Sequence, residues 1–392
     1  MKITSSIKKT KMLIKNAKVF IDGNFLNVDV KFDNKKILEI GNNLEDEEVI
    51  DAKGNYLYAG LIDCHNHGGW LRNFMDTETG VFGTFEDEIK FLCDKFPSAG
   101  VTTVYPTLSG SNYEIIARSV KKIRKVKSEC KGAKIAKFQF EGLYMSLDRY
   151  LTDARVPLSI EHSNYIVDND YSDIGLFHVS CDAENTIEWV DYMVSKGVMP
   201  CVGNTQASAE DVHRAADHGL CQADHMYNGY EAMHHRKEGA AVAVLLDDRI
   251  KAQITCDSHH VSPSFIKLLI KTKGIDNVYG VTDQSHYSGL SEGKHTLPDG
   301  KTVIAKDGLI YDTNGYINSG NLALNDMMKA ARDKCHLSMN EVGLLYAENV
   351  AKCLNIKDRG KIEVGRIPDF VIMDEDYKVL QTIIDGEVYY VA

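Results

Sequence analysis

The sequence predicts an α/β fold: a (β/α)8 TIM-like barrel over residues 57–360, with a small β-sandwich domain built from both chain ends, residues 1–56 and 361–392. Three observations support this. Eight apolar, strand-like runs in the middle of the chain end in polar residues, and helical stretches follow several of them. Both ends alternate apolar and polar residues between turn residues. No GxGxxG turn follows the first run, which disfavours the alternative of a doubly wound open sheet.

The two chain ends have the pattern of short strands. The first part contains MLIKNAKVFID, NFLNVDVKFDNKKILEIG and EEVIDAKG, separated by Gly, Asn and Asp turns. The tail contains KIEVGRIPDFVIMDED and KVLQTIIDGEVYYVA, which alternate in the same way. Because these segments flank the repeated middle, we expect them to share one sheet domain.

The middle of the chain repeats a strand followed by a helix. The strand-like runs are LYAGLIDCHNHG, GVTTVYPTLS, AKIAKFQFEG, DIGLFHVSCDAE, VMPCVGNTQ, GLCQADHMYN, IKAQITCDSHH and NVYGVTDQS. Amphipathic segments such as YEIIARSVKKIRKVKSEC and ASAEDVHRAADHG lie between them. Eight such units favour a closed parallel barrel.

Composition narrows the class of protein. The chain has 392 residues and a formal net charge of −11, so its overall field repels nucleic acid, and an anionic substrate needs local positive groups. The nine cysteines show no CxxC spacing, which is typical of reduced thiols. No signal peptide and no membrane-length apolar run is recognised, so we expect a cytoplasmic protein without a membrane partner.

Ligand-type side chains stand at the ends of the predicted barrel strands. His65 and His67 form an HxH pair, and strand alternation places both on one face. Glu141, His225 and Asp283 end later strands. Singly, such residues are more often surface histidines, caps, turns or hydrogen-bonded core residues. Together, at the carboxyl ends of barrel strands, they indicate a site for a divalent metal ion such as Zn, Fe or Mn.

Longer motifs resemble a known family. AGLIDCHNHGG, GVTTVYPT, FEG, the VGNT-to-DHMYN stretch, HHRKEG, DSHHV, GVTDQ and ENVAKCLNIKDRGKIEVGRIPDFVIMD occur in the order found in N-acetylglucosamine-6-phosphate deacetylases of the amidohydrolase superfamily. The resemblance covers roughly residues 12–390. It implies a metal-dependent enzyme of amino-sugar catabolism that hydrolyses N-acetylglucosamine 6-phosphate to glucosamine 6-phosphate and acetate.

The resemblance also implies roles for individual residues. His65 and His67 match the first metal pair, Glu141 the metal-binding carboxylate, His225 a further metal-binding histidine, and Asp283 the acid/base carboxylate, which is a metal ligand as well.

Substrate-binding residues are implied in the same way. Asn228 and Gly229 match backbone that grips the sugar phosphate, and Arg236 matches an arginine that contacts the phosphate across a dimer interface, with His235 beside it. His260 matches a histidine that binds substrate near the scissile amide and takes part in catalysis. A homodimer acting on a phosphorylated amino sugar is therefore expected.

The departures from the family pattern bear on metal and substrate. Asn204 stands where the family has a metal-binding histidine, and an amide oxygen is a poor ligand for a transition metal. We therefore expect one well-held metal, with His65, His67, Glu141 and Asp283 as its set. The loop 284–289 also differs. Alternatives are an amidohydrolase for another N-acyl amino sugar, an acylamino acid or a cyclic amide, or a non-catalytic sugar-phosphate-binding homologue.

Overall fold

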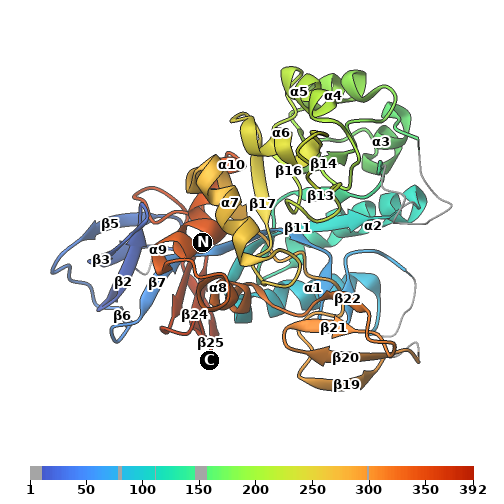
Figure 1. Ribbon diagram of the computed structural model, residues 1–392. Coiled ribbons are helices and arrows are strands. Elements are labelled where there is room, and N and C mark those ends of the chain that lie inside the picture. The colour runs from blue at the N-terminus through green and yellow to red at the C-terminus, as the bar shows by residue number, and fades with distance from the viewer. Residues whose placement is uncertain (1–10, 78–81, 111, 146–156, 298–299) are drawn as a thin grey trace, which may run out of the picture.

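The computed structural model describes residues 11–77, 82–110, 112–145, 157–297 and 300–392, and it contains the predicted barrel (Figure 1). Eight strands pair side by side in parallel, each with its neighbour in the chain. They are β8 (Leu61–Asn66), β11 (Val101–Ser109), β13 (Phe138–Glu141), β14 (Ile174–Val179), β15 (Met199–Val202), β16 (Gln222–Ala223), β17 (Lys251–Ile254) and β18 (Val278–Gly280). The short β12 (Lys134–Ile135) also pairs with β11.

Hydrogen bonds just beyond the last strand close the barrel. The amide of Asp283 donates to the carbonyl of His65 at 3.0 Å, and the amide of His67 donates to the carbonyl of Gln284 at 2.8 Å. Asn66 and Gln284 form a parallel bridge. The first and last barrel segments therefore meet where the predicted site residues lie.

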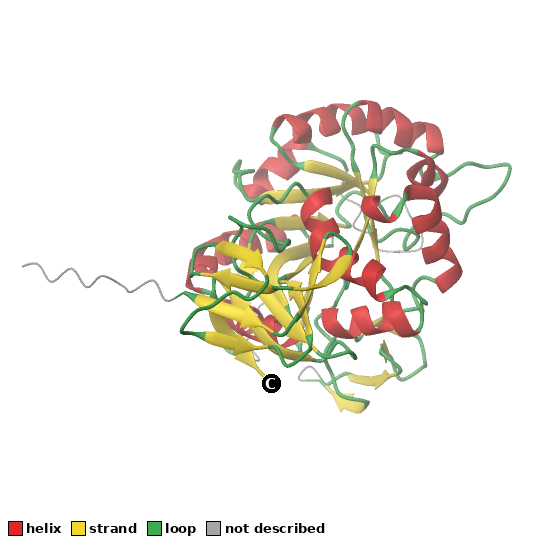
Figure 2. Cartoon of the chain, turned by 90° about the vertical axis from the view of Figure 1, so that its left-hand side faces the viewer, coloured by secondary structure: helices red, strands yellow, loops and turns green. Residues whose placement is uncertain are grey.

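Helices follow the strands and surround them (Figure 2). Those between successive barrel strands are α1 (Phe85–Lys95), α2 (Tyr113–Val126), α3 (Ile160–Val167), α4 (Thr186–Ser195), α5 (Ala209–Asp217), α6 (Ala240–Leu246) and α7 (Pro263–Lys273). Local signals explain their bounds: α5 starts with a capping box between Ser208 and Asp211, and α2 buries Ile116, Val120 and Ile123 along one face. Both predicted amphipathic segments are thus helices.

Further helices follow the last barrel strand along the chain. These are α8 (Leu324–Asp333), α9 (Met339–Gly343), η4 (Leu344–Glu348) and α10 (Asn349–Cys353). Short turns of helix are η1 (Phe96–Ala99), η2 (Lys127–Glu129) and η3 (Ile275–Asn277), and β9 (Gly68–Gly69) pairs with β10 (Arg72–Asn73). Within the described ranges, no helix has both the length and the apolar character needed to cross a membrane.

The two chain ends share a six-stranded sheet beside the barrel, at the left of Figure 1. Its strands, in spatial order, are β25 (Glu387–Val391), β24 (Val379–Ile384), β23 (Phe370–Met373), β7 (Tyr56–Ala59), β2 (Lys18–Ile21) and β3 (Asn24–Asn27). The antiparallel pair β7–β23 joins the ends. A second sheet comprises β5 (Ile37–Gly41), β4 (Asp29–Phe32), β1 (Met12–Lys15) and β6 (Val49–Asp51). The domain bounds 1–56, 57–360 and 361–392 stay a prediction.

A further small sheet follows the last barrel strand, and the strand patterns above did not include it. It comprises β19 (Gly293–Thr296), β20 (Thr302–Lys306), β21 (Leu309–Tyr311) and β22 (Ile317–Gly320), all antiparallel (Figure 1). The signal was present, because Asp307-Gly308 and Asn314-Gly315 separate short alternating runs, as hairpin turns do.

Candidate active site

The five predicted metal ligands converge at the carboxyl ends of the barrel strands. The Nε2 atoms of His65 and His67 lie 3.2 Å apart. The Oε2 atom of Glu141 lies 3.6 Å from Nε2 of His65 and 3.1 Å from that of His67, and Oδ1 of Asp283 lies 3.3 and 3.4 Å from the same two atoms. The side chain of His65 is fully buried, whereas that of Asp283 is 28% exposed. We call His65, His67, Glu141 and Asp283 the cage.

Five separations within the cage are close to those around one tetrahedral divalent ion. A tetrahedron with metal–ligand bonds of about 2.0–2.1 Å has ligand–ligand edges of about 3.3–3.4 Å, which is about 1.63 times the bond length. The five separations given above run from 3.1 to 3.6 Å. Imidazole nitrogens with carboxylate oxygens are donors that Zn²⁺ and Fe²⁺ accept. Two overlapping groups of described residues could hold a metal ion: His65, His67 and Asp283, and His65, Glu141, Asp224 and His225.

Charge in the cage also favours a cation. Burial raises the pKa of Glu141, but hydrogen bonds with His225, His65 and His67 outweigh it and hold that pKa well below its usual range. Burial likewise raises the pKa of Asp283, and the nearby His65 and His67 hold it below its usual range. Burial lowers the pKa of His67, but the carboxylates raise it to about 9. In the absence of metal, protons on the histidines balance the charge of the ionised carboxylates, so metal binding must release protons.

The second carboxylate oxygen of Glu141 accepts hydrogen bonds instead of facing the cage. Its Oε1 lies 2.8 Å from Nε2 of His225 and accepts a hydrogen bond from the side-chain nitrogen Nδ2 of Asn204 at 2.8 Å. Asn204 thus presents a donor here and not a ligand oxygen. A Cβ on Gly229 would lie 1.9 Å from Oδ1 of Asn204, so this orientation needs a glycine at 229, where φ is also +66°. The number of ions held per chain stays a prediction.

A cavity of about 670 Å³ opens onto the cage. It is lined by His67, Ser109, Gly110, Glu141, Gly142, Met145, Asn204, His225, Tyr227, Asn228, Gly229, His260, Asp283, Ser285, Asn318, Ser319 and Gly320. The structure thus brings the predicted substrate residues Asn228, Gly229 and His260 to the metal ligands. The volume is ordinary for a small-molecule site.

His260 is held by a carboxylate that sequence reasoning missed. Its Nδ1 lies 2.5 Å from Oδ2 of Asp257, which is almost fully buried and also accepts from the amides of His259 and His260. This hydrogen bond, with the opposing effect of burial, raises the pKa of His260. Because Nδ1 is occupied, Nε2 is the nitrogen left for substrate. The signal was in the DSHH segment, where Asp257 is the third residue after the barrel strand β17.

The predicted anion-binding pair does not lie in this cavity. His235 and Arg236 are exposed in the segment before α6, and neither lines the cavity. Within the described residues, no lysine or arginine lines it. A phosphate in the cavity would therefore need a basic group from elsewhere.

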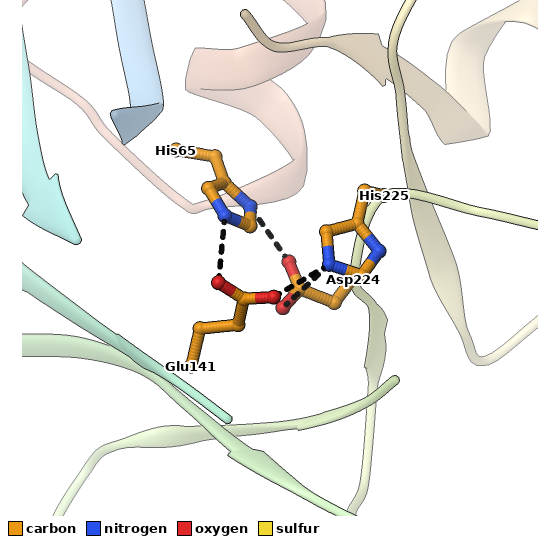
Figure 3. A group of neighbouring side chains, drawn as sticks. All are labelled: His65, Glu141, Asp224 and His225. Carbon is orange, nitrogen blue, oxygen red and sulfur yellow. Dashed lines mark hydrogen bonds and ion pairs between the residues drawn. The ribbon is translucent and has the colours of Figure 1, made fainter. Parts of the chain in front are cut away.

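Several other polar side chains were also missed. Ser285, Asn318 and Ser319 reach the cavity from the loop after β18 and from β22. Asp224 lies against His65 inside the barrel (Figure 3). His178, on β14, accepts from the amide of Gly142 at 2.9 Å and contacts the carbonyl oxygen of Gly203 with its other nitrogen, so it links two of the loops that carry site residues.

The class of protein follows from this barrel and site. Residues 56–389 match the Amidohydrolase family, and the chain belongs to that family. It is therefore a hydrolase of carbon–nitrogen bonds other than peptide bonds.

Particular relatives carry more specific names. The chain is 24% identical over 354 residues, 88% of its length and 87% of the other's, to an N-acetylglucosamine-6-phosphate deacetylase of Bacillus subtilis (strain 168). It is 23% identical over 343 residues, 86% of its length and 84% of the other's, to an N-acetylgalactosamine-6-phosphate deacetylase of Shewanella sp. (strain ANA-3). The crystal structure of N-acetylglucosamine-6-phosphate deacetylase from Pasteurella multocida superposes with a TM-score of 0.87 at 24% identity, covering 97% of this chain and all of that one.

Proposed function

We propose that this protein hydrolyses the acetamide of an N-acetylated amino sugar 6-phosphate, with N-acetylglucosamine 6-phosphate as the first candidate. The observation that carries the proposal is the cage of His65, His67, Glu141 and Asp283 at the floor of a cavity that His260 also lines. The names of its relatives support the substrate class. The products are acetate and an amino sugar 6-phosphate, and we expect the protein to act in the cytoplasm.

The cage would hold one divalent ion through His65, His67, Glu141 and Asp283. When bound, this ion supplies Lewis-acid chemistry, which acidifies water and polarises a carbonyl group.

The chain's own side chains handle the protons. Although burial raises the pKa of Asp283, neighbouring positive charge holds it low, so the carboxylate stays ionised and accepts a proton from the attacking water. His260, whose Nδ1 is bound by Asp257, offers Nε2–H to the carbonyl oxygen as negative charge develops there. Asp283 then returns the proton to the departing amine nitrogen, and the carbon–nitrogen bond breaks.

The described cavity of one subunit does not account for binding of the substrate's phosphate. Since no lysine or arginine lines the described cavity, we propose that Arg236 of a second copy supplies the guanidinium, as the family resemblance implies. A planar guanidinium binds phosphate through two hydrogen bonds. A homodimer is therefore part of the proposal.

The same observation favours a second candidate. A cavity lined by hydroxyl and amide groups also suits an uncharged substrate, such as an N-acyl amino sugar without phosphate. An acylamino acid and a cyclic amide are the other amides to test.

Acetate release tests the proposal directly. Purified protein loaded with Zn²⁺, Fe²⁺ or Mn²⁺ is offered N-acetylglucosamine 6-phosphate, N-acetylgalactosamine 6-phosphate and unphosphorylated N-acetylglucosamine, with chelator-treated protein as the control. We expect acetate from a phosphorylated sugar only when metal is present. Turnover of the uncharged sugar alone would favour the second candidate. Binding of a sugar phosphate without acetate release under any metal would replace the enzyme with a binding protein.

A further inference from the structure

A buried carboxylate that no expectation included lies against the metal cage. Asp224 precedes His225 directly after β16, and its side chain is fully buried. Its Oδ1 lies 2.9 Å from Nδ1 of His65. Figure 3 shows this carboxylate between the rings of His65 and His225.

The contact determines which nitrogen of His65 carries a proton. Nδ1 lies near two acceptors, Oδ1 of Asp224 at 2.9 Å and Oε1 of Gln253 at 2.8 Å, and near the side-chain amide nitrogen of Gln139 at 2.8 Å, which donates to Asp224. A carboxylate oxygen and an amide oxygen have no hydrogen to donate, so Nδ1 contacts them as the protonated donor. The lone pair of His65 is therefore on Nε2, the nitrogen that lies within the cage.

The carboxylate is itself fixed by neighbouring strands. The side-chain nitrogen Nε2 of Gln139 on β13 donates to Oδ1 of Asp224 at 2.9 Å. The same nitrogen lies 2.8 Å from Nδ1 of His65. The oxygen of Gln139 accepts from the amide nitrogen of Gln253 on β17 at 3.1 Å. All four side chains are buried, so water does not compete for these bonds.

On this geometry we propose that Asp224 is a positioning residue for the metal centre, holding His65 in the tautomer and orientation that present Nε2 to the ion. A carboxylate behind a metal-binding histidine also makes that histidine a more basic ligand. The inference rests on the proposed metal-dependent function and adds a group outside the cage to it.

The rival role, direct ligation of a second ion, fits the contacts less well. Oδ2 of Asp224 is buried without a hydrogen-bond partner and lies 4.0 Å from Nε2 of His225, which would suit a second ion beside Glu141. However, Asn204 directs its amide nitrogen to Oε1 of Glu141, so a hydrogen-bond donor takes the place of a lone pair there. The Oδ1 atom of Asp224 is already bound to His65 and Gln139.

Asp224→Asn tests the inference, because it keeps the size and removes the charge. Metal affinity and stoichiometry are measured with Zn²⁺ by chelator competition, in the absence of substrate. We expect binding 10- to 100-fold weaker, as is typical for such outer carboxylates, with the stoichiometry unchanged at one ion. Asp369→Asn is the matched control, since Asp369 is buried beside Arg359 and outside the site. It should lower stability and leave metal affinity unchanged.

Two results of the affinity measurement overturn the inference. Zn²⁺ affinity within threefold of the unmutated protein would make Asp224 merely structural. A fall from two ions to one, with the remaining affinity unchanged, would make Asp224 a ligand. If the variant does not fold, ¹⁵N-histidine NMR of the unmutated, Zn²⁺-loaded protein decides: protonated Nδ1 on His65 supports the inference and unprotonated Nδ1 refutes it. If the unmutated protein binds no divalent ion at all, it is the proposed function that fails.

Discussion

Replacement of Asp283 by asparagine separates an enzyme from a binding protein most sharply. The side chain keeps its size, but a neutral amide cannot accept the proton of the attacking water. Asp283 Oδ1 lies 3.3 and 3.4 Å from the cage nitrogens of His65 and His67, so the substitution also touches metal binding. The hydrogen bond from the backbone amide of Asp283 to the carbonyl of His65 does not involve the side chain and should survive the substitution.

The expected loss follows from the missing proton transfer. General acid–base catalysis is worth roughly 10²–10⁴-fold, which corresponds to about 2.7–5.5 kcal/mol in the activation free energy. We expect kcat to fall by at least 10²-fold, while the equilibrium binding of the sugar phosphate changes little.

The assay must distinguish loss of the base from loss of the metal. Turnover, substrate binding and metal content are measured on the same preparation at a metal concentration that saturates the variant. Turnover within tenfold of the unmutated protein, with metal bound, would refute the assignment of Asp283 as the proton carrier.

Three further predictions follow from the structure. Asn204→His places a lone pair beside Glu141 Oε1 and should raise metal content toward two ions per chain, measured by elemental analysis; content that stays at one would mean that Asn204 does not limit the second site. Arg236→Ala should lower kcat/KM for the phosphorylated sugar about 10- to 100-fold through loss of a charge-assisted hydrogen bond of ~1.5–3 kcal/mol, and equal loss on the unphosphorylated sugar would make Arg236 structural. Burial raises the pKa of Glu348 from 4.5 to about 7, so the stability that the protonated side chain provides below pH 4.5 is lost as pH rises through 7. At pH 8, Glu348→Gln should therefore raise the free energy of unfolding by up to about 3 kcal/mol, measured by urea denaturation. At pH 4.5 the variant and the unmutated protein should be equally stable.

Much of the fold could be predicted because its signals are local. Alternation along a strand and a 3.6-residue period along a helix depend only on neighbours in the chain, so the barrel repeats and the strands at both ends were recognisable. The same alternation placed His65 and His67 on one face. The rule that parallel strands direct their carboxyl ends to one rim then brought Glu141 and Asp283 to them. The small sheet β19–β22 was missed although its turn residues are present.

The tertiary structure decided what depends on convergence from distant strands. Asp224 contacts His65 through an interaction that spans the barrel interior, and neither residue type nor spacing predicts that contact. Asn204 could have presented oxygen or nitrogen, and the carboxylate of Glu141 selected the nitrogen. Arg236 was predicted to contact a phosphate across a dimer interface, and the fold of one chain leaves it exposed outside the described cavity of that chain, so its role stays a prediction. Residue type and period are properties of the chain, whereas the partner of a side chain depends on which strands lie next to each other.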